Sequence, residues 1–227
     1  MRFALLLAGL SAAYGLASAA RAQTTHDAQL WLNATVQGSV GRNLVYFVEV
    51  QPRIGEDVNR LQQLILRPAI GIKVSPAVTL YQGYAHIVLP RAGGPDGKED
   101  RSFQQLSWTM GSVGPGTLSS RTRLEQRWLS GGDDMGLRLR QTARYAVPFG
   151  RGSDMAALAS VEGFVALNDT DWGARAGFDQ VRTFLGVELP LPGRSTVEAG
   201  YLNQIVNDPG DRARMNHVLS IGLFVRP

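Results

Sequence analysis

Arginine and glutamate side chains recur at every second position within residues 117–147. The members are Arg121, Arg123, Glu125 and Arg127, followed after a Gly-Gly-Asp-Asp turn by Arg138, Arg140 and Arg144. Because successive side chains of a strand point to opposite faces, this spacing predicts a β-hairpin with one charged face and one mostly apolar face. Guanidinium groups form planar, multi-donor pairs with carboxylates, so the chemistry such a face offers is ion pairing in a crowded, partly desolvated interior.

Later segments carry further charged residues on the corresponding face. They are Glu162, Arg182, Glu188 and Glu198. Paired carboxylates can serve as general acid and base, but a carboxylate among many arginines is better placed for structural ion pairing. We therefore predict one charge ladder that lines a narrow, self-neutralised interior, with no catalytic residue in it.

Few other residues have types and spacing that suit catalysis or metal binding. The histidines, His26, His86 and His217, are isolated from one another and show no metal-ligand spacing. Asn216 and His217 are weak candidates for a lipid hydrolase with Ser220 nearby, but strand parity sends Ser220 and His217 to opposite faces. The favoured interpretation is that Asn216 and His217 cap a strand. The sequence predicts no metal and no cofactor, and the absence of cysteine excludes disulfides and thiol nucleophiles.

Acidic residues also gather between the expected strands. Asp96, Glu99 and Asp100 fall in one such stretch, and Asp169 and Asp171 fall in another. Solvated loop charge is the favoured interpretation, and divalent cations that bridge lipopolysaccharide are the alternative.

The N-terminus resembles a secretory signal peptide over residues 1–22. Arg2 precedes an apolar stretch, and Ala20-Arg21-Ala22 fits a small-x-small cleavage site before Gln23. Without Arg2 and Arg21, the 23 basic residues fall to 21 against 19 acidic residues. This near balance, without any Lys/Arg-rich block, argues against a nucleic-acid partner. Residues 23–227 show no change of composition and are predicted to form a single β-barrel domain.

Strand-like segments of about ten to thirteen residues follow one another to the C-terminus, separated by Gly, Pro, Asp and Asn. Their length suits a tilted bilayer span, and short and long connections alternate. We count eleven segments, whereas bacterial single-chain barrels have even strand numbers. The first segment, 30–38, therefore either does not span, which leaves ten strands, or a twelfth is hidden. The predicted fold is all-β, an antiparallel up-and-down transmembrane β-barrel of 10 to 12 strands.

Several local motifs occur in a recognisable order. They are Gly83-Tyr84, Glu99-Asp100-Arg101, the run 119–128, Arg138 to Gln141, Gly177 to Gln180 with Arg182, Glu198 with Gly200 to Asn203, and Asn216-His217. With these motifs the chain resembles the bacterial family catalogued as domain of unknown function 2490, over nearly all of the expected mature chain. The resemblance implies a signal-bearing, outer-membrane-like barrel and supplies no activity. The ending Phe224-Val225-Arg226-Pro227 departs from the C-terminal aromatic of many outer-membrane strands.

The favoured function is that of a non-enzymatic barrel in the bacterial outer membrane, structural or open to small solutes. Its expected partners are outer-membrane lipid and the barrel assembly machinery, and a small-molecule ligand is unidentified. Two alternatives stay open: an outer-membrane lipid hydrolase with His217 as its base, and a soluble periplasmic barrel that binds an apolar ligand.

Overall fold

The computed structural model describes residues 24–208 and 212–227, so the predicted signal peptide, residues 1–22, lies outside the described residues. The described residues form eleven strands and contain no helix long and apolar enough to cross a membrane. The strands are β1 (Thr24–Val40), β2 (Leu44–Gly55), β3 (Arg60–Lys73), β4 (Val78–Leu89), β5 (Gly97–Val113), β6 (Gly116–Leu129), β7 (Gly136–Pro148), β8 (Ala156–Ala166), β9 (Gly177–Pro190), β10 (Thr196–Asp208) and β11 (Arg212–Val225).

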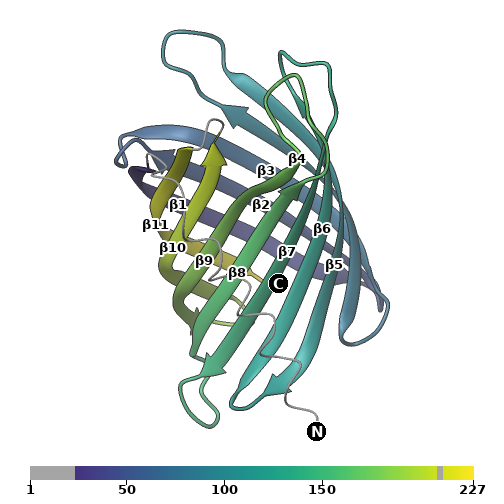
Figure 1. Cartoon of the computed structure of the whole chain (residues 1–227). Coiled ribbons are helices and arrows are strands. Elements are labelled where there is room, and N and C mark those ends of the chain that lie inside the picture. The colour runs from purple at the N-terminus through teal and green to yellow at the C-terminus, as the bar shows by residue number, and fades with distance from the viewer. Residues whose placement is uncertain (1–23, 209–211) are drawn as a thin grey trace, which may run out of the picture.

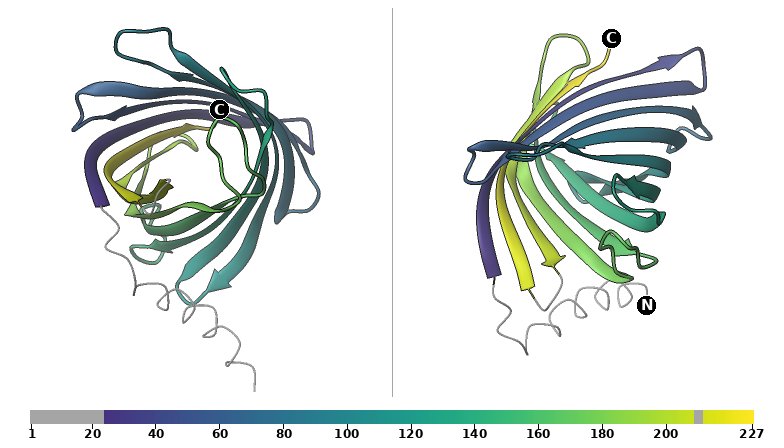
Figure 2. Two further views of the ribbon diagram at one scale, coloured as in Figure 1. Left: turned by 45° about the horizontal axis from the view of Figure 1, so that its top comes forward. Right: turned by 90° about the horizontal axis from the view of Figure 1, so that it is seen from above.

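The strands make one closed barrel, as the alternating sequence predicts. Each strand pairs in antiparallel fashion with the next, and β1 closes the ring against β11 in parallel, from Thr24 opposite Ala213 to Val36 opposite Val225. Figure 1 shows the strands crossing the wall obliquely, and the left view of Figure 2 shows purple β1 beside yellow β11.

The strand number lies inside the predicted range, but the argument from even numbers is wrong. The 30–38 segment belongs to a full strand, β1, and no twelfth strand is needed among the described residues. Eleven strands are joined by ten antiparallel pairings, so the first and last strands point the same way and can close the wall only through a parallel seam.

Connections gather at two ends of the barrel. The loop end carries residues 56–59, 90–96, 130–135 and 167–176, and the turn end carries 41–43, 74–77, 114–115, 149–155 and 191–195. The long loops rise at the top of Figure 1. The predicted alternation of lengths is only approximate, because 149–155 spans as many residues as 90–96. The stretch predicted to lie between strands at Asp96, Glu99 and Asp100 is also shorter than expected, since β5 already begins at Gly97.

The outer face of the wall is largely apolar. On β3 the outward side chains Leu64, Leu66, Ile70 and Ile72 are 38–57% exposed, while Ile65 between them is 1% exposed. Four polar side chains interrupt this face across β4, β5 and β6. Gln82, Ser102, Gln104 and Gln126 hydrogen-bond to one another there, including Gln104 Nε2 to Gln82 Oε1 at 2.9 Å and Gln126 Nε2 to Gln104 Oε1 at 3.0 Å.

The lumen is divided between apolar and charged side chains. On β2 to β5 the inward residues include two apolar clusters alongside charged residues such as Glu49 and Arg67: Phe47, Ala69 and Phe103 pack with Tyr81, and Ile65, Ala85 and Ile87 pack with Leu89. Gly83 makes room for this packing, because a Cβ there would lie 2.0 Å from Cζ of Phe103. We call this side the apolar half of the lumen. The charged half, on β5 to β10, is described next.

Candidate functional site

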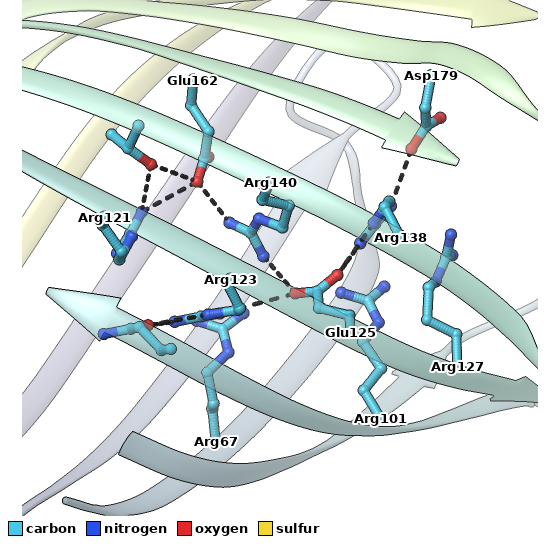
Figure 3. A network of polar contacts seen from close by, with 12 residues as sticks. Arg67, Arg101, Arg121, Arg123, Glu125, Arg127, Arg138, Arg140, Glu162 and Asp179 are labelled. Carbon is cyan, nitrogen blue, oxygen red and sulfur yellow. Dashed lines mark hydrogen bonds and ion pairs between the residues drawn. The ribbon is translucent and has the colours of Figure 1, made fainter. Parts of the chain in front are cut away.

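The structure places all eleven residues of the predicted ladder in ion pairs within 4 Å. Figure 3 shows the central part of this network. The residues are Arg121, Arg123, Glu125, Arg127, Arg138, Arg140, Arg144, Glu162, Arg182, Glu188 and Glu198. They come from β6 to β10, and the pairs join neighbouring and more distant strands across the lumen.

Glu125 is the centre of the network and is 1% exposed. Its Oε2 accepts from Arg138 Nη2 at 2.6 Å and its Oε1 accepts from Arg140 Nη1 at 2.7 Å, while Arg123 Nη1 lies 3.7 Å away. Arg138 continues to Asp179 Oδ2 at 3.0 Å. One carboxylate thus faces three guanidinium groups, which can be buried together only because each also has another partner.

Glu162 forms a second centre on β8. Its Oε1 accepts from Arg140 Nη2 at 2.9 Å, from Arg121 Nη2 at 3.0 Å and from the hydroxyl of Thr142 at 2.9 Å. Arg182 Nη1 lies 3.6 Å from Oε2 of the same carboxylate. Because Arg140 bonds to both glutamates, it joins the two centres into one layer across the lumen.

Nearer the turn end, Arg144 makes a two-point pair with Glu198. Its Nη1 and Nη2 donate to Glu198 Oε2 and Oε1 at 2.9 and 2.8 Å, and Glu188 lies 3.5 Å away. This fork matches carboxylate geometry and fixes both side chains.

The sequence analysis missed several members of the network. Glu99 was assigned to a solvated loop, which is wrong: it is 4% exposed on β5 and accepts from Arg101 Nε at 2.8 Å and Arg127 Nε at 2.5 Å. Arg67 pairs with Glu49. Strand parity would have found all of them, because each sits on the inward register of its strand.

Aromatic rings separate several of the guanidinium groups. Arg123 lies over Phe103 at 4.2 Å, and Arg140 and Arg182 each lie 4.6 Å from the ring centre of Phe164. Trp31 on β1, also missed, is 3% exposed and contacts two arginines, Arg53 at 3.8 Å and Arg182 at 4.9 Å. Cation–π contacts of this kind partly replace lost hydration in a desolvated site.

Two cavities open into the lumen beside this layer. The cavity toward the loop end has a volume of about 580 Å³, and one toward the turn end has about 240 Å³. Trp31, Arg53, Arg67, Arg140 and Arg182 line both cavities, so the layer of arginines lies between them. Such an arrangement can hold or delay a small polar solute.

The two weak candidates lie on opposite faces of β11. Asn216 is 4% exposed in the lumen, where its Nδ2 donates to Gln204 Oε1 at 2.9 Å. His217 lies on the outer face, with its Nε2 3.1 Å from Nδ1 of His26 and its Nδ1 2.7 Å from the hydroxyl of Tyr201. Ser220 lines the turn-side cavity. These residues do not assemble a nucleophile and a base, and since they lie within β11 they do not cap it.

The fold and this interior define a closed β-barrel with a charged, aromatic-lined lumen. The chain belongs to the family described as protein of unknown function DUF2490, whose model matches residues 28–216. It is 51% identical over 208 residues to an uncharacterised protein of Methylorubrum extorquens, a match that covers 91% of each chain. No solved structure matches the chain.

Proposed function

We propose that this protein is a β-barrel of the bacterial outer membrane whose lumen is narrowed by the arginine–glutamate layer, and that it passes or holds small polar solutes. The observation that carries the proposal is the inversion of its two faces. Leucine and isoleucine are exposed on the outside, whereas Glu125 and Arg123 are 1% and 3% exposed inside. A barrel folded in water would place these classes the other way round.

Backbone geometry supports the same location. A membrane has no water to satisfy peptide groups, so a sheet can span it only as a closed barrel without free edges. The parallel pairing of β1 with β11 removes the last two edges here. The strands hold 11 to 17 residues, at least the roughly 9–11 that a tilted bilayer span requires.

The four-residue polar cluster on the outer face fits this location as well. An amide in lipid is costly when it lacks a hydrogen-bond partner. Gln82, Gln104 and Gln126 supply partners to one another, and the hydroxyl oxygen of Ser102 accepts from Gln82 Nε2 at 3.0 Å. The cluster therefore enters lipid with much of its hydrogen bonding already made.

The narrow lumen favours small solutes over a general diffusion pore. Ten to twelve strands enclose little space, and here the arginine layer lies between cavities of about 580 and 240 Å³. Outer-membrane lipid would surround the wall, and the barrel assembly machinery would insert it.

Expression of the full chain in a Gram-negative host tests the location. We expect the protein in the detergent-resistant outer-membrane fraction, with folded, unboiled protein migrating differently from boiled protein on a gel. Recovery as a soluble periplasmic protein without detergent would overturn the proposal.

Conductance tests the passage. Purified barrel in planar bilayers should give small, infrequent openings, because the arginine layer narrows the path. Removal of Arg144 together with both of its carboxylate partners, Arg144→Ala with Glu188→Ala and Glu198→Ala, should raise conductance without leaving any of the three charges unpaired. Wide, constant pores in the unaltered protein would contradict the narrowed lumen.

A further inference from the structure

Arg53 differs from the other inward-facing arginines of the described strands. Each of the others on β2 to β10 has a carboxylate within 4 Å, but Arg53 has none. Its Nε and Nη2 donate to Gln51 Oε1 at 3.1 and 2.7 Å, and its Nη1 donates to Gln63 Oε1 at 3.1 Å. Neutral amide oxygens satisfy some of its N–H groups and leave its charge uncompensated.

Arg182 lies close to the same position and is weakly compensated. Both guanidinium groups contact the ring of Trp31, Arg53 at 3.8 Å and Arg182 at 4.9 Å. The nearest carboxylate to Arg182 is Glu162 at 3.6 Å, and that carboxylate already accepts from Arg121 and Arg140 at 3.0 and 2.9 Å. Two positive groups are therefore held around one indole without a carboxylate of their own.

The cavity into which these side chains open carries an excess of positive charge. Nine arginines and only four carboxylates line the loop-side cavity of about 580 Å³. That volume lies within the usual range for small-molecule sites. The low dielectric constant of a protein interior strengthens the attraction between the arginines and an anion. The lumen was predicted to neutralise its own charge, but on this side the arginines outnumber the carboxylates.

We propose that Arg53 and Arg182 form a binding site for the oxyanion group of a small solute, a phosphate, sulfate or carboxylate. Guanidinium groups suit such groups because their N–H donors match two oxygens at once. The remaining N–H groups of Arg53 and Arg182 would donate to the anion. Trp31, whose ring both guanidinium groups contact, would hold the two cations near each other. Small oxyanions would then be the solutes of the passage proposed above. Their route to the site rests on that proposed function, whereas their binding depends only on Arg53 and Arg182.

Isothermal titration of the folded, detergent-solubilised full chain with inorganic phosphate and with sulfate tests the site. Arg53→Gln and Arg182→Gln should each weaken binding about tenfold or more, because each removes charge-assisted hydrogen bonds to the anion. Arg42→Gln, an exposed change in a turn-end connection, is the matched control and should bind as the unaltered protein does. Gel mobility of unboiled samples verifies that every variant is folded.

Three outcomes would overturn the site: no binding of either anion, equal binding by all variants, or equal loss in Arg42→Gln. Mixed micelles with phosphatidic acid provide a second arm, because a lipid could present the same phosphate from outside. The site faces the lumen, so free phosphate should bind and the lipid should not compete, whereas binding of the lipid alone would overturn the inference. If the protein is recovered as soluble and still binds the anion, only the proposed membrane location is overturned. If the protein is a membrane barrel that binds neither anion, only this binding site is overturned.

Discussion

The two halves of the lumen bury their side chains by different physical means. In the apolar half, Phe103 and Ile87 are 1% and 0% exposed and are held by contact with neighbours of the same kind. In the charged half, Glu125 is equally buried but depends on arginines from the next strand. Dispersion contacts are many and weak, whereas a buried charge depends on a few strong partners. A single substitution in the apolar half should therefore disturb only its neighbours, whereas one in the charged half should also disturb the partners of the residue that is changed.

Glu125→Gln should have the largest effect. The change keeps the shape but removes the charge that faces Arg123, Arg138 and Arg140, and loss of one partner of a buried pair costs about 3–5 kcal/mol. Urea unfolding in micelles, followed by the mobility of unboiled protein, measures the loss. Glu56→Gln breaks an exposed pair with Arg60 and should lower the unfolding free energy far less, because both side chains are solvated. Equal effects of the two changes would contradict the coupled charged half.

Gly83→Ala tests the apolar half and should have a smaller effect. The added Cβ meets the ring of Phe103, and overpacking of this kind costs about 1–3 kcal/mol. Phe103→Leu in the same chain should recover part of that loss. The control is Gly163→Ala on β8, where a Cβ meets nothing within 4 Å, so stability should change little. If Phe103→Leu brings no recovery, local packing is not the cause.

Arg121→Gln sharpens the comparison from within the charged half. Arg121 is 40% exposed, and its partner Glu162 keeps Arg140, Arg182 and the hydroxyl of Thr142. Since no charge is left buried alone, the loss of unfolding free energy should stay within about 1 kcal/mol. If the unfolding free energy falls about as much as in Glu125→Gln, then membership of the ion-pair network, and not burial of the changed residue, determines the loss of stability.

The alternation of residues 117–147 was enough to predict the charged half, because strand parity is local and the ladder residues are polar where their neighbours are not. The apolar half was not visible in the sequence. On β3, both the outward Leu64 and Leu66 and the inward Ile65 are apolar, so alternation cannot tell the lumen from the outside.

Features that depend on closure of the barrel were also missed. The parallel seam joins residues about 190 positions apart, and no local pattern encodes that pairing. Glu99 was misassigned because Gly and Pro residues immediately before it resemble a loop. The role of Trp31 depends on Arg53 and Arg182, which reach it from β2 and β9.

The smallest effect is expected where the charged half meets the loops. Asp171, in the loop 167–176, accepts from the backbone N–H groups of Asp133 and Asp134 at 2.8 and 3.2 Å, and thereby joins two loops. These backbone hydrogen bonds, that from Asp133 foremost, hold the pKa of Asp171 below the ordinary value of 3.8. The neighbouring Trp172 lies over Arg127, a partner of Glu99, so the joined loops rest on the charged network.

Because the folded-state pKa of Asp171 is lowered, its contribution is complete above the ordinary aspartate value and is lost as pH falls through the folded value. Hydrogen exchange at Asp133 and Asp134 should therefore quicken only below about pH 4, relative to the intrinsic rates of these amides. Asp171→Asn should quicken exchange already at neutral pH and flatten the pH dependence, while the unfolding free energy of the barrel changes little. In that case the contact between the two loops forms and opens independently of the charged half of the lumen. If Asp171→Asn instead lowers barrel stability as Glu125→Gln does, the network extends through Trp172 into the loops, and the charged half does not end at the strands.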